Sequence, residues 1–166
     1  MISDTVRDAL SEQVNRELAS AYLYLSMSSF ASYKGLNGVA NWLMIQWQEE
    51  IEHAEKSFTY VQDQGQHVVC EALGKPPSEF DSVRAMFDMA LANEISLSGS
   101  INELLNVARD ENDNATQVFL QWFVTEQVEE ENNARHIIDM LNLAGDEGEG
   151  LFLVDKELAQ RTAEAG

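Results

Sequence analysis

Residues 47–58 read WQEEIEHAEKSF and place charged side chains within a helical repeat of apolar ones. Trp47, Glu50 and Ala54 are separated by three and four positions, so they share one face of a helix. His53 lies one turn beyond Glu50 on that face, which gives an E-x-x-H pattern. The segment therefore predicts a helix that turns a carboxylate and an imidazole toward the protein core.

The same spacing of apolar residues continues through most of the chain and predicts further helices. Both prolines stand together at residues 76–77, so the strongest helix breaker is missing elsewhere. Ser3, Asn37 and either Asp81 or Ser82 are candidate N-caps. The predicted helices cover about residues 3–33, 37–64, 82–110, 113–143 and 150–161.

The connections between these helices predict the topology. The links after the first and third helices are short, so each links an antiparallel pair of helices. Residues 65–81 have no helical periodicity. An extended connector of about 16 residues spans about 50 Å, enough to run alongside a helix of about 42 Å. We therefore expect an all-α fold in which residues 1–166 form one domain, a four-helix bundle with one long crossover connection.

The apolar segment at residues 151–154 predicts a short fifth, C-terminal helix that is too short to join the bundle. Because four helices already cover their own core, we expect this helix to bury its apolar side chains against other subunits. The alternative is that it packs across one end of its own bundle.

Composition excludes several classes of partner and compartment. The chain has 29 acidic and 10 basic side chains, a formal net charge of −19. This charge repels nucleic acid and anionic membrane surfaces but attracts cations. The single Cys70 cannot form an intramolecular disulfide, and residues 1–5 do not resemble a signal peptide. No apolar run approaches the roughly twenty residues that span a bilayer. We expect a cytoplasmic protein without nucleic-acid or membrane partners.

Polar side chains interrupt the apolar face of every predicted bundle helix near its midpoint. Because midpoints lie at one height whichever way a helix runs, these side chains should converge. Isolated ionised carboxylates are very unstable there, and the inward positions offer no Lys or Arg. Two divalent first-row metal ions, such as iron or manganese, would balance four carboxylates; a neutral network of protonated acids is the alternative. The residues are Glu17, the Glu50–His53 pair, Glu94 and the Gln127–Glu130 pair.

These residues, together with three further features, give the chain a resemblance to the bacterial-type non-haem ferritins over nearly its whole length. The further features are Tyr24, the motif FLQW at residues 119–122 and the tail GEGL at residues 148–151. The resemblance implies a ferritin-like fold and a homo-oligomer, a hollow shell of twenty-four subunits. Members of that family take in Fe(II), oxidise it with dioxygen at a di-iron centre in each subunit and store ferric mineral inside the shell.

The resemblance also implies roles for individual residues. Glu17, Glu50 and His53 would bind the first iron. Glu50, Glu94 and Glu130 would bind the second, with Glu50 bridging the two. Gln127 would assist, either as a weak ligand or by supporting a neighbouring ligand.

A third iron site and a redox side chain are further implications of the resemblance. Glu49, Glu126 and Glu129 would form the third site together with Glu130; the alternative is a solvated acidic face. Tyr24, two helical turns after Glu17, would hydrogen-bond a ligand or deliver an electron, although an ordinary core tyrosine looks the same in a sequence.

Two departures separate the chain from related families. Bacterioferritins carry a second E-x-x-H on the fourth helix and a haem-binding Met after the bridging glutamate. Here those positions hold Gln127-x-x-Glu130 and Ile51, so we expect no haem. Rubrerythrin-like peroxidases need four cysteines for an iron site, whereas this chain has one. Mini-ferritins lack the fifth helix that is predicted here. Both families are therefore excluded.

The sequence thus predicts an iron-storage ferroxidase, an Fe(II):oxygen oxidoreductase. One alternative is a di-iron oxygenase or oxidase acting on an organic substrate, which would need an apolar channel beside the metals. Another is a purely structural helical oligomer whose central acids bind no metal.

Overall fold

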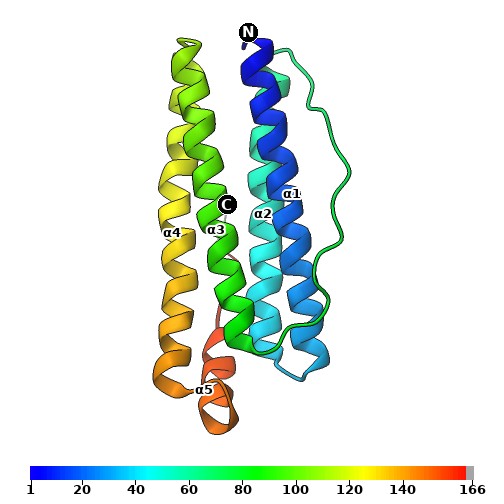
Figure 1. The fold of residues 1–166 in the computed structure, drawn as a ribbon, viewed down its shortest axis with the longest axis vertical. Coiled ribbons are helices and arrows are strands. Elements are labelled where there is room, and N and C mark those ends of the chain that lie inside the picture. The colour runs from blue at the N-terminus through cyan, green and yellow to red at the C-terminus, as the bar shows by residue number, and fades with distance from the viewer. Residues whose placement is uncertain (164–166) are drawn as a thin grey trace.

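Five helices make up the structure, a computed structural model that describes residues 1–163 (Figure 1). Within these residues no strand is present, and the predicted all-α four-helix bundle with a short C-terminal helix is confirmed. No described helix is both long and apolar enough to cross a membrane. The helices are α1 (Asp4–Tyr33), α2 (Asn37–Asp63), α3 (Val83–Asp110), α4 (Asn114–Ala144) and α5 (Gly148–Leu158).

Most helix starts follow from local capping. The Ser3 and Ser82 hydroxyls accept hydrogen bonds from the first turns of α1 and α3, as predicted, and Asp113 caps α4. The prediction for Asn37 is wrong, because the N-cap of α2 is Leu36, which makes no side-chain cap hydrogen bond.

The missing cap of α2 is supplied from far along the chain. Asp155 on α5 accepts a hydrogen bond of 2.9 Å from the backbone N–H of Val39. Its negative charge at a helix N-terminus is also favourable to the helix dipole. The start of α2 is therefore fixed by tertiary contact, which no local pattern reveals.

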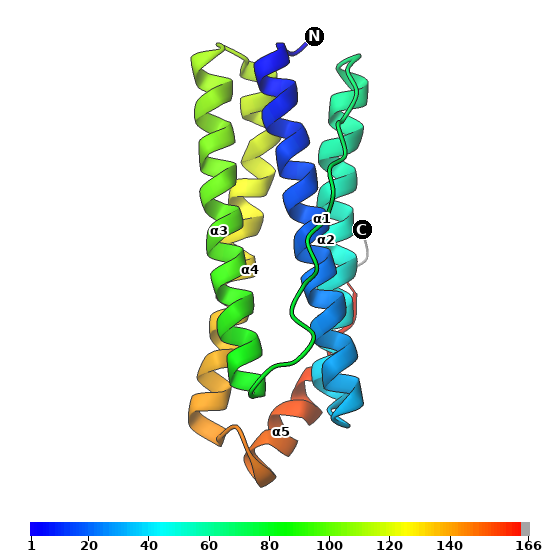
Figure 2. The same ribbon diagram turned by 45° about the vertical axis from the view of Figure 1, so that its right-hand side comes forward.

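The long crossover is confirmed. Residues 64–82 leave the end of α2, run along the outside of the α1–α2 pair and enter α3 at the opposite end (Figures 1 and 2). Asn15 holds this connector by donating to the carbonyl oxygen of Val69 at 2.8 Å, and Ser26 donates to that of Pro77 at 2.5 Å. The two hydrogen bonds fix the connector to α1 near the middle and near the far end of that helix.

The core consists of two apolar clusters with a polar layer between them. One cluster, which includes Met27, Trp42 and Phe87, occupies the end near α5. The other, which includes Leu10 and Leu120, occupies the end near the N-terminus. On each bundle helix the residues predicted to bind metal lie between the residues of the two clusters. The bundle is thus closed by apolar packing above and below its centre.

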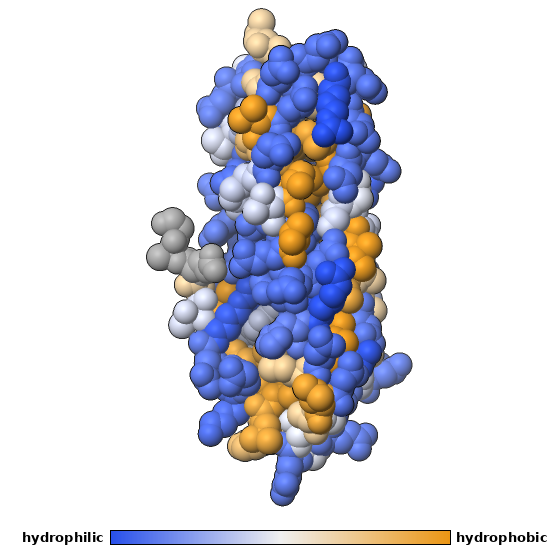
Figure 3. Space-filling view, turned by 90° about the vertical axis from the view of Figure 1, so that its left-hand side faces the viewer, coloured by the Kyte–Doolittle hydropathy of each residue, from blue (hydrophilic) through white to orange (hydrophobic). Residues whose placement is uncertain are grey.

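Helix α5 packs across one end of the bundle against α2 and α4 (Figure 2). It begins two residues earlier and ends three residues earlier than predicted. Val154 and Leu158 are buried beneath it, whereas Phe152 and Leu153 are 66% and 60% exposed. One face of the helix therefore covers its own bundle, and the other face keeps apolar side chains exposed. Packing across the bundle end was the alternative to the predicted contact with other subunits. Apolar side chains also gather on the surface at this end in Figure 3.

Candidate metal centre

Four glutamates, one from each bundle helix, are buried in the central polar layer. Helical spacing turns each of them inward, as the sequence predicts. The exposed fraction is 3% or less for every one of these carboxylates and for the imidazole beside them. They are Glu17 on α1, Glu50 with His53 on α2, Glu94 on α3 and Glu130 on α4.

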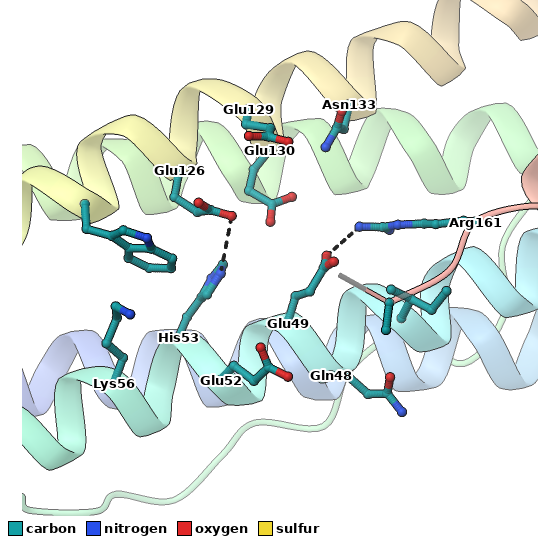
Figure 4. A pocket seen from close by; sticks show the side chains of 13 residues that line it. Gln48, Glu49, Glu52, His53, Lys56, Glu126, Glu129, Glu130, Asn133 and Arg161 are labelled. Atoms are coloured by element: carbon teal, nitrogen blue, oxygen red, sulfur yellow. Dashed lines mark hydrogen bonds and ion pairs between the residues drawn. The ribbon is translucent and has the colours of Figure 1, made fainter. Parts of the chain in front are cut away.

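Their donor atoms form two groups that share His53. Glu17, Glu50 and His53 offer atoms within 4.8 Å of one another, and so do His53, Glu126 and Glu130. The imidazole Nδ1 lies 3.9 Å from Glu50 Oε1, and its Nε2 lies 3.9 Å from Glu126 Oε1 (Figure 4). The imidazole therefore stands between a fully buried carboxylate and the wall of an open pocket.

Glu94 belongs to neither group, and neighbouring side chains hold both its oxygens. The Tyr24 hydroxyl donates to one carboxylate oxygen. Gln127 donates to the other at 3.2 Å and to the Glu94 backbone carbonyl at 3.1 Å. The structure thus brings Tyr24 and Gln127 to the same glutamate and fixes its orientation.

Two buried amides orient the other carboxylates, and the sequence prediction missed both. Gln13 donates to Glu17 Oε1 at 2.7 Å. Gln46 donates to Glu130 Oε2 at 2.7 Å and more weakly, at 3.4 Å, to Glu50 Oε1. Each amide stands four residues before a glutamate of its own helix, so the same periodicity could have found them.

Several buried donor atoms make no hydrogen bond within the described part of the chain. A buried polar atom without a partner is costly and uncommon in a native fold. Carboxylate oxygens and a neutral imidazole nitrogen suit a divalent first-row metal. The donor set therefore fits a metal ion. The atoms are Glu17 Oε2, Glu50 Oε2, His53 Nδ1 and Gln127 Oε1.

Burial also controls protonation in this layer. It raises the pKa of Glu17 to about 7, against the hydrogen bond from Gln13 and with help from the charge of Glu94. Burial and neighbouring carboxylates raise the pKa of Glu50 and of Glu130 well above the ordinary range. Burial lowers the pKa of His53 to about 4, which keeps the imidazole neutral and able to bind metal. The metal-free layer therefore holds protons that a cation would displace.

A pocket of about 330 Å³ opens the polar layer to solvent between α2 and α4 (Figure 4). Glu126, Glu129 and Glu130 reach into it from α4, and Glu49 faces them from α2. All four residues predicted for the third site thus line one pocket, which adjoins the buried carboxylates through Glu130.

Among the residues that the structure describes, two cations line this pocket, Lys56 from α2 and Arg161 from a part of the chain that the prediction did not use. Arg161, three residues after α5, places its guanidinium 2.5 Å from Glu49 Oε2 and 3.0 Å from Gln46 Oε1. No periodicity marks Arg161, because its position depends on the path of the chain after α5.

Comparison with known proteins places this arrangement in a family. Residues 7–144 match the Ferritin-like domain family. A probable bacterial non-heme ferritin-like protein from Haemophilus influenzae is 37% identical, over 99% of this chain and 100% of that protein. A bacterial non-heme ferritin from Escherichia coli O157:H7 is 39% identical over 96% of each chain.

Solved structures agree with the sequence relatives. An open-pore ferritin from the archaeon Archaeoglobus fulgidus is 45% identical and superimposes with a TM-score of 0.95, over 98% of this chain and 99% of that chain. A closed form of the same ferritin, engineered by mutagenesis, is 44% identical with a TM-score of 0.96, over 99% of this chain and 100% of that chain. Sequence, fold and the buried carboxylate layer agree: this chain belongs to the ferritin family, beside the bacterial non-heme ferritins.

Proposed function

We propose that this protein oxidises Fe(II) with dioxygen at the buried carboxylate layer and stores the ferric product inside a homo-oligomeric shell. The observation that carries the proposal is the layer itself, in which four buried glutamates and a neutral imidazole leave donor atoms unpartnered. Iron is here the substrate and the cargo. Two Fe(II) ions would balance the four carboxylates once their protons leave.

The first Fe(II) binds Glu17, Glu50 and His53, whose donor atoms are already grouped. The second binds Glu50, Glu94 and Glu130, so that Glu50 is shared between the two ions. Glu94 must turn from its present hydrogen bonds to take part, and Gln127 and Tyr24 are the partners that it exchanges for a metal. Tyr24 is then placed to hydrogen-bond a ligand or to supply an electron.

A third iron site in the open pocket extends the centre. Its ligands are Glu49, Glu126, Glu129 and the shared Glu130. Carboxylates gathered on one wall repel one another, and a bound cation reduces that repulsion. The pocket gives iron a path between solvent and the buried layer.

Storage requires an enclosed volume, which one bundle cannot supply. We therefore assign the protein to a shell of twenty-four subunits in the cytoplasm, in keeping with its likeness to bacterial non-heme ferritins over almost their whole length. The face between α2 and α4 borders the interior in this proposal, because the product must leave the pocket toward the store.

The test adds Fe(II) to the metal-free protein without oxygen and then admits air. The wild type should bind and oxidise two Fe(II) per subunit in a fast phase. Glu50→Ala and His53→Ala should slow that phase at least about tenfold, because each removes a direct ligand. His67→Ala is the control, since His67 is exposed on the connector. Normal initial rates in both ligand variants would exclude this site.

The same experiment separates the alternatives. An oxygenase for organic substrates would turn over without accumulating iron, whereas a storage protein retains far more iron than its binding sites hold. A structural oligomer would show no fast phase at all. Several of the side chains that line the pocket are carboxylates, which favours a cation over an apolar substrate as its ligand.

A further inference from the structure

The chain after α5 turns back along the bundle and is anchored on α2. Asn41 donates a hydrogen bond of 3.1 Å to the backbone carbonyl of Arg161. The guanidinium lies over the Trp42 ring, 4.3 Å from its centroid, and donates to the Trp42 carbonyl at 3.3 Å. Both the backbone and the side chain of Arg161 are therefore held in place.

The two arms of this guanidinium reach two different parts of the metal centre. Nη2 is 2.5 Å from Glu49 Oε2, at the mouth of the pocket (Figure 4). Nη1 donates to Gln46 Oε1 at 3.0 Å. Because guanidinium nitrogens only donate, this contact turns the amide oxygen of Gln46 outward and its NH₂ toward Glu130. Arg161 thus orients a donor to a buried carboxylate as well as pairing with Glu49.

The pair is well placed to oppose a metal ion at the same carboxylate. The side chains of Arg161 and Glu49 are only 18% and 21% exposed, so solvent screens their attraction incompletely. A cation that binds Glu49 meets the Arg161 charge at close range, because both use the same carboxylate group.

From these contacts we infer that Arg161 is a positioning residue that opposes metal binding at the proposed third cation site. The guanidinium and the third metal ion compete for Glu49, so filling the site displaces Arg161 from it. The competition lowers the affinity of the third site for metal. The inference rests on the proposed third site and adds to it a coupling between metal occupancy and the C-terminal segment.

Terbium(III), a luminescent cation with a preference for carboxylates, tests the competition in the assembled metal-free protein. Glu129→Gln identifies the third site, because Glu129 is a proposed ligand of that site and of no other. Arg161→Gln should tighten terbium binding at that site roughly tenfold, the usual effect of one charge-assisted hydrogen bond. Arg161→Lys keeps the charge and should restore near wild-type affinity. Lys75→Gln removes a charge from the exposed connector and should change nothing.

The outcomes distinguish failure of the inference from failure of the proposed site. If Glu129→Gln loses no terbium relative to the wild type, the third site itself is wrong. If that site exists but Arg161→Gln leaves its affinity unchanged, Arg161 does not compete with metal and the inference is overturned. Affinity in Arg161→Lys equal to that in Arg161→Gln would also overturn it, because the effect would then come from loss of packing.

Crystals of the wild-type protein soaked in Zn(II) give an independent readout of position. With zinc on Glu49, the Arg161 guanidinium should have left hydrogen-bond distance of that carboxylate. Zinc and guanidinium bound together to Glu49 would contradict competition.

Discussion

A single buried acid, Glu17, makes the free energy of unfolding of the metal-free protein depend on pH near neutrality. Its pKa is raised to about 7 in the folded state, so the folded protein holds this proton more tightly than the unfolded chain does. The stability gained is complete below the ordinary carboxyl pKa and is lost as pH rises through about 7. Glu17→Gln supplies a neutral side chain at every pH. We expect the unfolding free energy of the wild type, relative to this variant, to fall by roughly 2 kcal/mol between about pH 5.5 and 8.5.

Thermal or denaturant unfolding of the chelator-treated protein at the two pH values measures this difference. Comparison with Glu17→Gln removes the opposite contribution of His53, whose lowered pKa costs stability as pH falls below its ordinary value. Glu12→Gln, an exposed acid on the same helix, is the matched control and should show no such change. A pH-independent difference between wild type and Glu17→Gln would mean that Glu17 is already ionised.

Individual residues differ in how far the sequence could predict them. Glu17 and Glu50 can be predicted because acids at apolar positions of a helix are unstable unless a proton or a metal ion neutralises them. Gln13 and Gln46 share that periodicity, which turns them inward, but they carry no charge and so do not by themselves indicate a metal site. Arg161 has no periodic signal at all, because tertiary folding alone brings it to the site.

At the scale of elements, the docking of α5 depends on a glycine in the first turn of α2. A Cβ added at Gly38 would lie 1.6 Å from the backbone carbonyl oxygen of Asp155 and 2.9 Å from the backbone nitrogen of Ala159. Backbone atoms cannot rotate away, so Gly38→Ala must push α5 off α2. We expect a loss of at least about 2 kcal/mol in the free energy of unfolding.

Gly99→Ala on α3 is the matched control for this substitution. Nothing lies within 4 Å of a Cβ built at Gly99, and the helix interior favours alanine over glycine by about 0.5–1 kcal/mol. The two changes should therefore move the melting temperature in opposite directions. Equal or greater stability in Gly38→Ala would show that α5 does not sit where the structure places it.

Among the elements, the sequence predicted the four long helices and the crossover because apolar periodicity and turn residues agree along each of them. It placed the ends of α5 wrongly and missed the cap of α2. The cap of α2 comes from Asp155, far along the chain, so this boundary is not encoded locally.

Across the whole molecule, the buried acids divide one core into two apolar clusters, and the bundle is hollowed between α2 and α4. A protein selected for stability alone would fill this layer with apolar side chains. The acidic layer is therefore a cost that the apolar clusters on either side must offset. That cost is consistent with a fold retained for binding cations.

At this scale we expect the exposed face of α5 to contact other subunits of an assembly. Phe152 and Leu153 are mostly exposed on a helix whose other face covers its own bundle, so they belong to neither apolar cluster. A double variant, Phe152→Asp with Leu153→Asp, places two charges on this face. If α5 helps to close the shell, these charges should disrupt contacts between subunits and leave the bundle folded.

Light scattering coupled to size-exclusion chromatography should show the wild type as one large species and the double variant as much smaller ones. Far-UV circular dichroism should remain that of a helical bundle, because neither side chain contributes to the core. The variant should still oxidise its first Fe(II) ions, since the residues of the proposed metal centre all lie within one subunit. It should retain little mineral, because smaller species enclose no volume. An assembly of unchanged mass would show that α5 is not a closing contact and that its exposed side chains have another role.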